Sequence, residues 1–195
     1  MSFSAFLAFP GQGSQHQSML SKGGILDLAL SSEYSHVVEC CSDLISHDVF
    51  KLIEEGPEEL INRTSITQPI LILCSYLHFN KLVNTVDITP TYFAGHSLGE
   101  YSALSCAGYL DFSETLKILR IRGDAMQNSV PKGQGGMVAV LGSTAENVEK
   151  ILEDNNENFK AQIANDNSEG QIVLSGKIED LEKLIQVLKE NSIKN

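Results

Sequence analysis

The sequence predicts an α/β fold, because short apolar segments that suit buried strands alternate with longer segments of helical pattern. Two of these apolar segments, Phe3–Phe9 and Thr91–Ala94, end in glycine-rich turns that lead toward helices. Past residue 136 the expected order is strand, helix, strand, strand, helix, which is that of a split β-α-β unit of the ferredoxin-like kind before its last strand. We therefore divide the chain into an α/β core at 1–130 and a small subdomain at 131–195 that lacks its last strand.

The expected elements of the core follow a simple order. Phe3–Phe9 is a buried strand that breaks at Pro10-Gly11-Gln12-Gly13-Ser14, and the first helix follows that turn. The apolar segment Gln68–Val83 is long enough for a buried helix, which we expect to back the sheet. After the short strand Thr91–Ala94, helices are expected at 100–110 and from an N-cap at Asp111 to about residue 129.

The small subdomain begins after a linker rich in proline and glycine at 131–136. Its expected strands cover 137–141, 161–164 and 171–174, and its expected helices cover 144–154 and 179–189.

Composition excludes several classes of function. The 195 residues are 42% hydrophobic and 20% charged, which is ordinary for a globular protein. The net charge of -11 argues against nucleic-acid or anionic-membrane binding, since both need a basic surface. The chain has neither an apolar run of about 20 residues nor a basic residue before Lys22, so we expect no membrane anchor and no signal peptide. Its four cysteines lack C-x-x-C spacing, and we expect reduced thiols in a cytoplasmic protein.

The motif Gly95-His96-Ser97-Leu98-Gly99 matches G-x-S-x-G, in which a sharp strand-to-helix turn exposes a nucleophilic serine. At a helix N-terminus, free N–H groups and the positive end of the helix dipole face an oxygen that becomes negative during acyl transfer. The Leu98 amide is then the natural first oxyanion donor. The alternative is a helix N-cap serine in a plain turn.

Gln12 lies in a second loop at the carboxyl end of a strand, where α/β sheets bind ligands. Its side chain or backbone N–H could donate to the same oxyanion. The alternative is a glycine turn with no further role.

Arg122 is expected on the apolar face of its helix, because Ile118, Leu119, Ala125 and Met126 all lie three or four positions away. An inward guanidinium suits bidentate binding of a carboxylate. The alternative is an internal ion pair with Asp or Glu.

His96 adjoins the serine, but neighbours on a tight turn point in different directions, and bases in serine sites come from distant segments. We therefore do not assign it as the base. The other four histidines, His16, His36, His47 and His78, are expected to be surface or packing residues. No metal-binding pattern is present in the sequence, so we expect no metal site.

Four segments together resemble malonyl-CoA:acyl carrier protein transacylases along the whole chain: Phe9 to Gln15, Gly95 to Leu104, Arg122-Gly123 with Met126-Gln127, and Gln171 to Gly176. The resemblance implies an α/β-hydrolase-like core with an inserted ferredoxin-like (βαββαβ) subdomain. It implies transfer of a malonyl group from malonyl-CoA to the phosphopantetheine thiol of acyl carrier protein in type II fatty-acid biosynthesis, through a malonyl-serine. It places Ser97 as nucleophile and Gln12 with Leu98 as the oxyanion hole. It also implies that Arg122, with Gln12 and His96, binds the substrate.

The family's catalytic histidine lies downstream of Asn195, so we expect this sequence to be truncated before it and the chain as given to be impaired in turnover. No permanently bound cofactor is expected, and we expect a monomer. Two other functions stay open: a short form that binds coenzyme A thioesters or acyl carrier protein without turnover, and an α/β hydrolase that uses water. A hydrolase would have no need of an inward Arg122. A reading frame that continues past Asn195 to a histidine would exclude the binding module.

Overall fold

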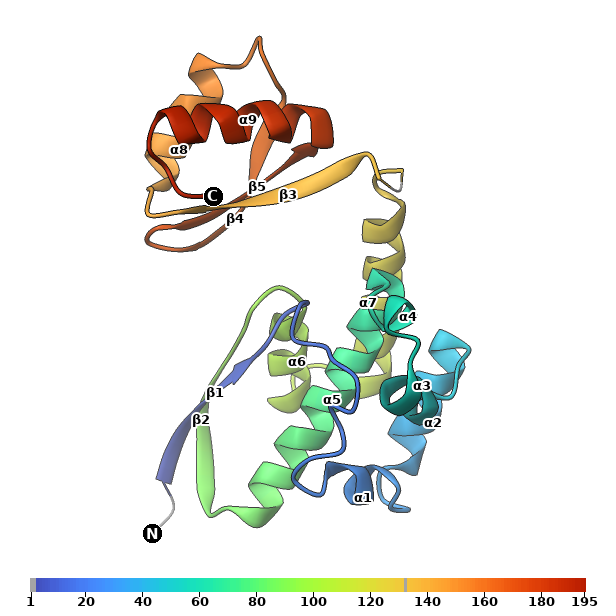
Figure 1. The fold of residues 1–195 in the computed structure, drawn as a ribbon. Coiled ribbons are helices and arrows are strands. Elements are labelled where there is room, and N and C mark those ends of the chain that lie inside the picture. Colours follow the sequence, from blue (N-terminus) through green and yellow to red (C-terminus); the bar gives the residue numbers. More distant parts are fainter. Residues whose placement is uncertain (1–2, 132) are drawn as a thin grey trace. The chain divides into compact units, whose positions relative to one another are not determined.

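The computed structural model describes residues 3–131 and 133–195, which divide into two compact units, Met1–Ser129 and Val130–Asn195 (Figure 1). The first unit contains a parallel strand pair with helices, and the second contains a small antiparallel sheet with two helices. The expectation of an α/β fold with a parallel sheet and a small second sheet is thereby confirmed. The finer descriptions, an α/β-hydrolase-like core and a ferredoxin-like insert, stay predictions.

The parallel pair consists of β1 (Phe3–Phe9) and β2 (Ile88–Gly95). Phe9 pairs with Gly95 at their carboxyl ends, so the two glycine-rich loops leave the sheet side by side. Figure 1 shows the two strands next to each other although 78 residues separate Phe9 from Ile88 in the chain. The convergence of the Gln12 and Ser97 loops at one edge therefore follows from strand pairing.

Seven helices of the first unit lie within the described residues: α1 (Ile25–Ala29), α2 (Ser35–Ile45), α3 (Val49–Glu55), α4 (Glu58–Ile61), α5 (Thr64–Thr85), α6 (Leu98–Cys106) and α7 (Phe112–Asn128). The sequence predicts that the first helix follows the glycine-rich turn at 10–14, but α1 begins only at Ile25. The buried helix expected at 68–83 is α5, which starts four residues earlier, at Thr64. Thr67 stabilises this added turn, because its hydroxyl donates to the carbonyls of Ile61 and Arg63.

The core of the first unit is built around α5, whose side chains from Ile70 to Leu73 are almost fully buried. Phe79 of α5 contacts both strands, with ring centroids 6.5 Å from Phe9 and 5.9 Å from Phe93. These ring contacts are within the range that stabilises aromatic pairs. The expectation that this helix backs the sheet is confirmed, and the sheet edge that bears the serine loop is held by apolar packing.

The second unit contains β3 (Gly135–Leu141), α8 (Ala145–Asp154), β4 (Ala161–Ser168), β5 (Gln171–Lys177) and α9 (Ile178–Glu190). The strand order is β3-β5-β4, and both pairings are antiparallel. After α9, the Leu141 N–H donates to the carbonyl of Lys194 at 2.8 Å, in an isolated antiparallel bridge. The second unit has a hydrophobic core of its own, which includes the fully or almost fully buried Val140, Ile172, Leu174 and Leu184.

Within the described residues, no helix combines the length and the apolar character that crossing a membrane requires.

Candidate active site

Ser97 forms a strained turn between β2 and α6. Its backbone φ is 56° and ψ is -111°, a positive-φ conformation that residues other than glycine rarely adopt. The flanking glycines are required by space, since a Cβ on Gly95 would lie 1.9 Å from the carbonyl carbon of Gly99, and a Cβ on Gly99 would lie 2.3 Å from the Phe9 oxygen. This is the geometry by which G-x-S-x-G turns present a serine above a sheet.

The Ser97 side chain does not cap the helix that follows it. Ser97 occupies the N-cap position of α6 but makes no side-chain capping hydrogen bond. Its Oγ instead accepts a hydrogen bond from Arg122 Nη2 at 2.9 Å. The alternative role as a simple N-cap serine is therefore wrong.

The backbone amide of Leu98 is placed to stabilise an anion. Leu98 is the first residue of α6, where an N–H has no acceptor within the helix. In the described part of the chain the next two amides donate to His96 and Ser97 carbonyls, whereas Leu98 N–H has no such backbone partner. The dipole of α6 adds positive potential at the same point.

Arg122 on α7 is half-buried and holds two uncharged partners. Its Nη1 donates to Gln68 Oε1 at 2.7 Å and its Nη2 to Ser97 Oγ at 2.9 Å. The guanidinium carbon lies 5.8 Å from the ring centroid of Tyr101, a cation–π distance. In residues 3–131 and 133–195 no ion pair joins Arg122 to a carboxylate. The described residues therefore do not support the alternative of an internal ion pair, and the partners that they give the Arg122 guanidinium carry no charge.

A close approach of two helices puts Arg122 beside Gln68. A Cβ on Gly123 would lie 2.8 Å from both Ser65 Cα and the Thr64 carbonyl oxygen. Glycine at this position lets α7 pack directly against the backbone of α5. The neighbouring guanidinium then reaches a side chain one turn further along α5.

The structure places Gln12 near the site but gives its side chain a different partner. Gln12 Nε2 donates to Thr64 Oγ1 at 3.0 Å, and the Thr64 N–H donates to Gln127 Oε1 at 3.3 Å. Gln12 therefore links the β1 loop to the start of α5. Its role in an oxyanion hole stays a prediction.

The hydrogen bond described for the Ser97 hydroxyl joins it to Arg122 and not to a histidine. The rings of His16, His47 and His78 each contact a backbone carbonyl of their own segment. His96 lies against the β1 loop, with Nδ1 2.7 Å from where a Cβ on Gly11 would be. The role of His96 in substrate binding stays a prediction. Within the described residues, no three His, Cys, Asp or Glu side chains are grouped to hold a metal ion.

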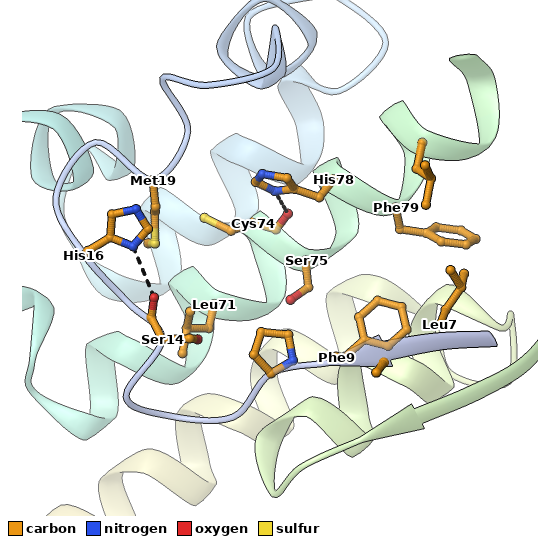
Figure 2. A pocket seen from close by; sticks show the side chains of 13 residues that line it. Leu7, Phe9, Ser14, His16, Met19, Leu71, Cys74, Ser75, His78 and Phe79 are labelled. Atoms are coloured by element: carbon orange, nitrogen blue, oxygen red, sulfur yellow. Dashed lines mark hydrogen bonds between the residues drawn. The ribbon is translucent and has the colours of Figure 1, made fainter. Parts of the chain in front are cut away.

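A cavity of about 360 Å³ lies between β1 and α5 and is also bordered by Ser14, His16 and Met19 of the segment that follows β1 (Figure 2). Its lining is largely apolar and includes Phe9, Leu71 and Phe79. Ser97 and Arg122 do not line it, so this cavity is distinct from the serine site.

Two contributors to the site were not predicted from the sequence, Gln68 and Tyr101. Gln68 is fully buried, and a polar side chain at the head of an apolar helix must find a hydrogen-bonding partner. That signal could have identified Gln68 from the sequence. Nothing in the pattern around Tyr101 indicates its contact with a helix that begins eleven residues later.

The fold and the strained serine together define a class: α/β proteins that carry a serine at a sharp strand-to-helix turn. The sequence pattern of the acyl transferase domain family matches residues 6–195 of this chain. The chain belongs to this family.

Similar proteins carry more specific names. The chain is 37% identical to a malonyl CoA-acyl carrier protein transacylase of Haemophilus influenzae, over 96% of this chain and 59% of that protein. A solved malonyl CoA-acyl carrier protein transacylase from Coxiella burnetii superposes with a TM-score of 0.86 at 36% identity, over all of this chain and 60% of that one. A malonyl-transacylase solved in complex with a type II polyketide acyl-carrier protein also gives 0.86, at 33% identity, over all of this chain and 61% of that one. The chain thus spans about three-fifths of the length of these relatives.

Proposed function

We propose that the protein transfers a malonyl group from malonyl-CoA to the phosphopantetheine thiol of acyl carrier protein, through a malonyl ester on Ser97. The observation that carries this proposal is the 2.9 Å contact between Arg122 Nη2 and Ser97 Oγ. This contact sets a guanidinium, with no carboxylate paired to it among the described residues, beside the serine that we propose as nucleophile, and it supports binding of a free malonyl carboxylate there. The names of the relatives support the same substrate.

The reaction has two halves. Ser97 Oγ attacks the thioester carbonyl, the oxyanion is stabilised by the Leu98 amide with Gln12 as second donor, and coenzyme A leaves as its thiol. The phosphopantetheine thiol then attacks the seryl ester, and Ser97 regains its proton. Both halves need a general base, and the family resemblance assigns that role to a histidine downstream of Asn195.

Mass spectrometry after incubation with malonyl-CoA tests the proposal, in this chain and in the complete product of its gene where the two differ. We expect a malonyl adduct on the peptide that contains Ser97, and none in Ser97→Ala. An adduct that persists in Ser97→Ala would refute the assignment of the nucleophile.

Adding an acyl carrier protein with its phosphopantetheine arm then tests the acceptor. We expect malonyl to move from Ser97 to the carrier thiol, as the solved complex of a relative with a carrier protein supports. Release of free malonate at the same rate with and without the carrier would instead support a hydrolase.

We further propose that the protein acts as a cytoplasmic monomer in fatty-acid biosynthesis and holds no permanent cofactor.

A further inference from the structure

Gln68 is a buried side chain whose amide is fixed at both ends. Its side chain is fully buried in α5. Oε1 accepts from Arg122 Nη1 at 2.7 Å, and Nε2 faces Met126 Sδ at 3.3 Å. The orientation of the amide is determined, because arginine only donates and must face the oxygen. Gln68 therefore contacts two residues one turn apart on α7.

The two terminal nitrogens of Arg122 consequently have different environments. Nη1 is held by a buried acceptor on a neighbouring helix, whereas the partner of Nη2 among the described residues is the Ser97 hydroxyl. Ser97 Oγ must lose that partner, or share it, when it attacks a thioester. Nη2 is thus the nitrogen that can exchange partners.

The neutral amide also preserves the charge of Arg122. A glutamate in place of Gln68 would put a carboxylate at hydrogen-bonding distance and compensate the guanidinium before any substrate arrived. Glutamine supplies the same acceptor oxygen without charge. Arg122 therefore keeps its attraction for a carboxylate that comes with the substrate.

We propose that Gln68 is a positioning residue that anchors Arg122 through Nη1 and thereby sets the preference for acyl groups that carry a free carboxylate. In the empty site Nη2 donates to Ser97 Oγ. In the loaded site the acyl carboxylate takes Nη2 and frees the serine hydroxyl. This inference rests on the proposed function, and it names the residue that holds the carboxylate-binding arginine in place.

Two substitutions of similar size test the role of Gln68, with adduct formation on Ser97 from malonyl-CoA and from acetyl-CoA as the readout. Gln68→Met removes the acceptor, and we expect the malonyl-to-acetyl ratio to fall about tenfold, the effect of one hydrogen bond to a charged group. Gln68→Glu compensates the charge, and we expect a fall of about a hundredfold. A purely structural role of Gln68 would instead slow malonyl and acetyl adduct formation alike and leave their ratio unchanged.

Thr67→Val is the matched control. Thr67 directly precedes Gln68 in α5 and is equally buried, but its hydroxyl is hydrogen-bonded away from the site. We expect it to lower the unfolding temperature and leave the malonyl-to-acetyl ratio unchanged. An unchanged ratio in folded Gln68→Met and Gln68→Glu overturns the inference, and so does failure of both variants to fold, which would make Gln68 a stability residue. All of these variants are made in the complete product of the gene, and absence of any adduct in its unaltered form would refute the proposed function itself.

Discussion

Arg122 Nη2 lies 2.9 Å from Ser97 Oγ, although 25 positions separate the two residues in the sequence. The contact joins the start of α6 to the middle of α7, and it is made while the same guanidinium is held by Gln68 on α5. Three helices therefore converge on one cation beside Ser97. We expect a charge in this position to distinguish substrates by whether they carry a compensating carboxylate.

The Arg122→Ala variant tests the carboxylate clamp. We expect malonyl adducts on Ser97 to form about a hundredfold more slowly, since charge-assisted hydrogen bonds to the carboxylate are lost, while acetyl adducts change little. The measurement is the initial rate of adduct formation from each thioester. Equal losses with both substrates would show that Arg122 acts on the serine and not on the malonyl carboxylate.

Much of the fold could be predicted because local patterns and tertiary structure agree. Phe3–Phe9 is apolar and ends at a proline and a glycine, and it forms β1 over the same residues. The expectation that this strand is buried holds for Phe9 but not for Phe3 and Phe6, whose side chains are exposed. Thr91–Ala94 was expected as a shorter strand than β2, which begins at Ile88. Pairing with β1 extends it, because strand length is decided by the partner strand as well as by propensity.

The site was predicted less completely, because its contacts depend on packing between helices. The motif around Ser97 and the apolar face that contains Arg122 are local patterns. Gln68 meets Arg122 only because Gly123 lets α7 approach α5, which no spacing within a single helix reveals. The partner of Gln12 likewise depends on where α5 begins, and the added turn from Thr64 was not expected.

Gly123→Ala tests the helix approach that brings the clamp together. The added methyl would lie 2.8 Å from backbone atoms of Ser65 and Thr64, so α7 must move. We expect a loss of about 1–3 kcal/mol in the free energy of unfolding, measured by urea titration, as for other overpacked positions. We also expect the malonyl preference to weaken, because Gln68 and Arg122 separate.

The control for this substitution is Ile121→Ala on the same helix. The Ile121 side chain is 69% exposed, so its truncation should change the free energy of unfolding by less than about 0.5 kcal/mol. A Gly123→Ala protein as stable as the Ile121→Ala protein would contradict the close approach of α5 and α7.

The buried thiols predict how stability depends on pH. Burial raises the pKa of Cys41 and Cys74, and it raises the pKa of Cys106 to about 12. In the unfolded chain these thiols ionise near pH 8.5. Their contribution to stability is present below that pH and is lost as the pH rises toward the folded-state values, because only the unfolded state releases protons.

We therefore expect the free energy of unfolding to fall between pH 8 and pH 10, by up to about 1.4 kcal/mol per pH unit for each thiol. Cys74→Ala should reduce this slope, whatever its effect at pH 7. Cys40→Ala is the control, since that thiol is exposed. If the free energy of unfolding fell equally steeply with pH in Cys74→Ala and Cys40→Ala, burial of the Cys74 thiol could not be the cause of the pH dependence.

Gln12 is the residue for which the family role and the observed contact differ, and substitution separates them. An oxyanion donor acts on every acyl group, so Gln12→Ala should slow malonyl and acetyl adduct formation alike, by about a hundredfold or more if the donor is direct. Thr64→Val removes only the hydroxyl that Gln12 contacts at 3.0 Å. If Gln12 leaves Thr64 to reach the oxyanion, Thr64→Val should have a much smaller effect than Gln12→Ala. Equal effects would mean that Gln12 works through Thr64, by holding the β1 loop against α5.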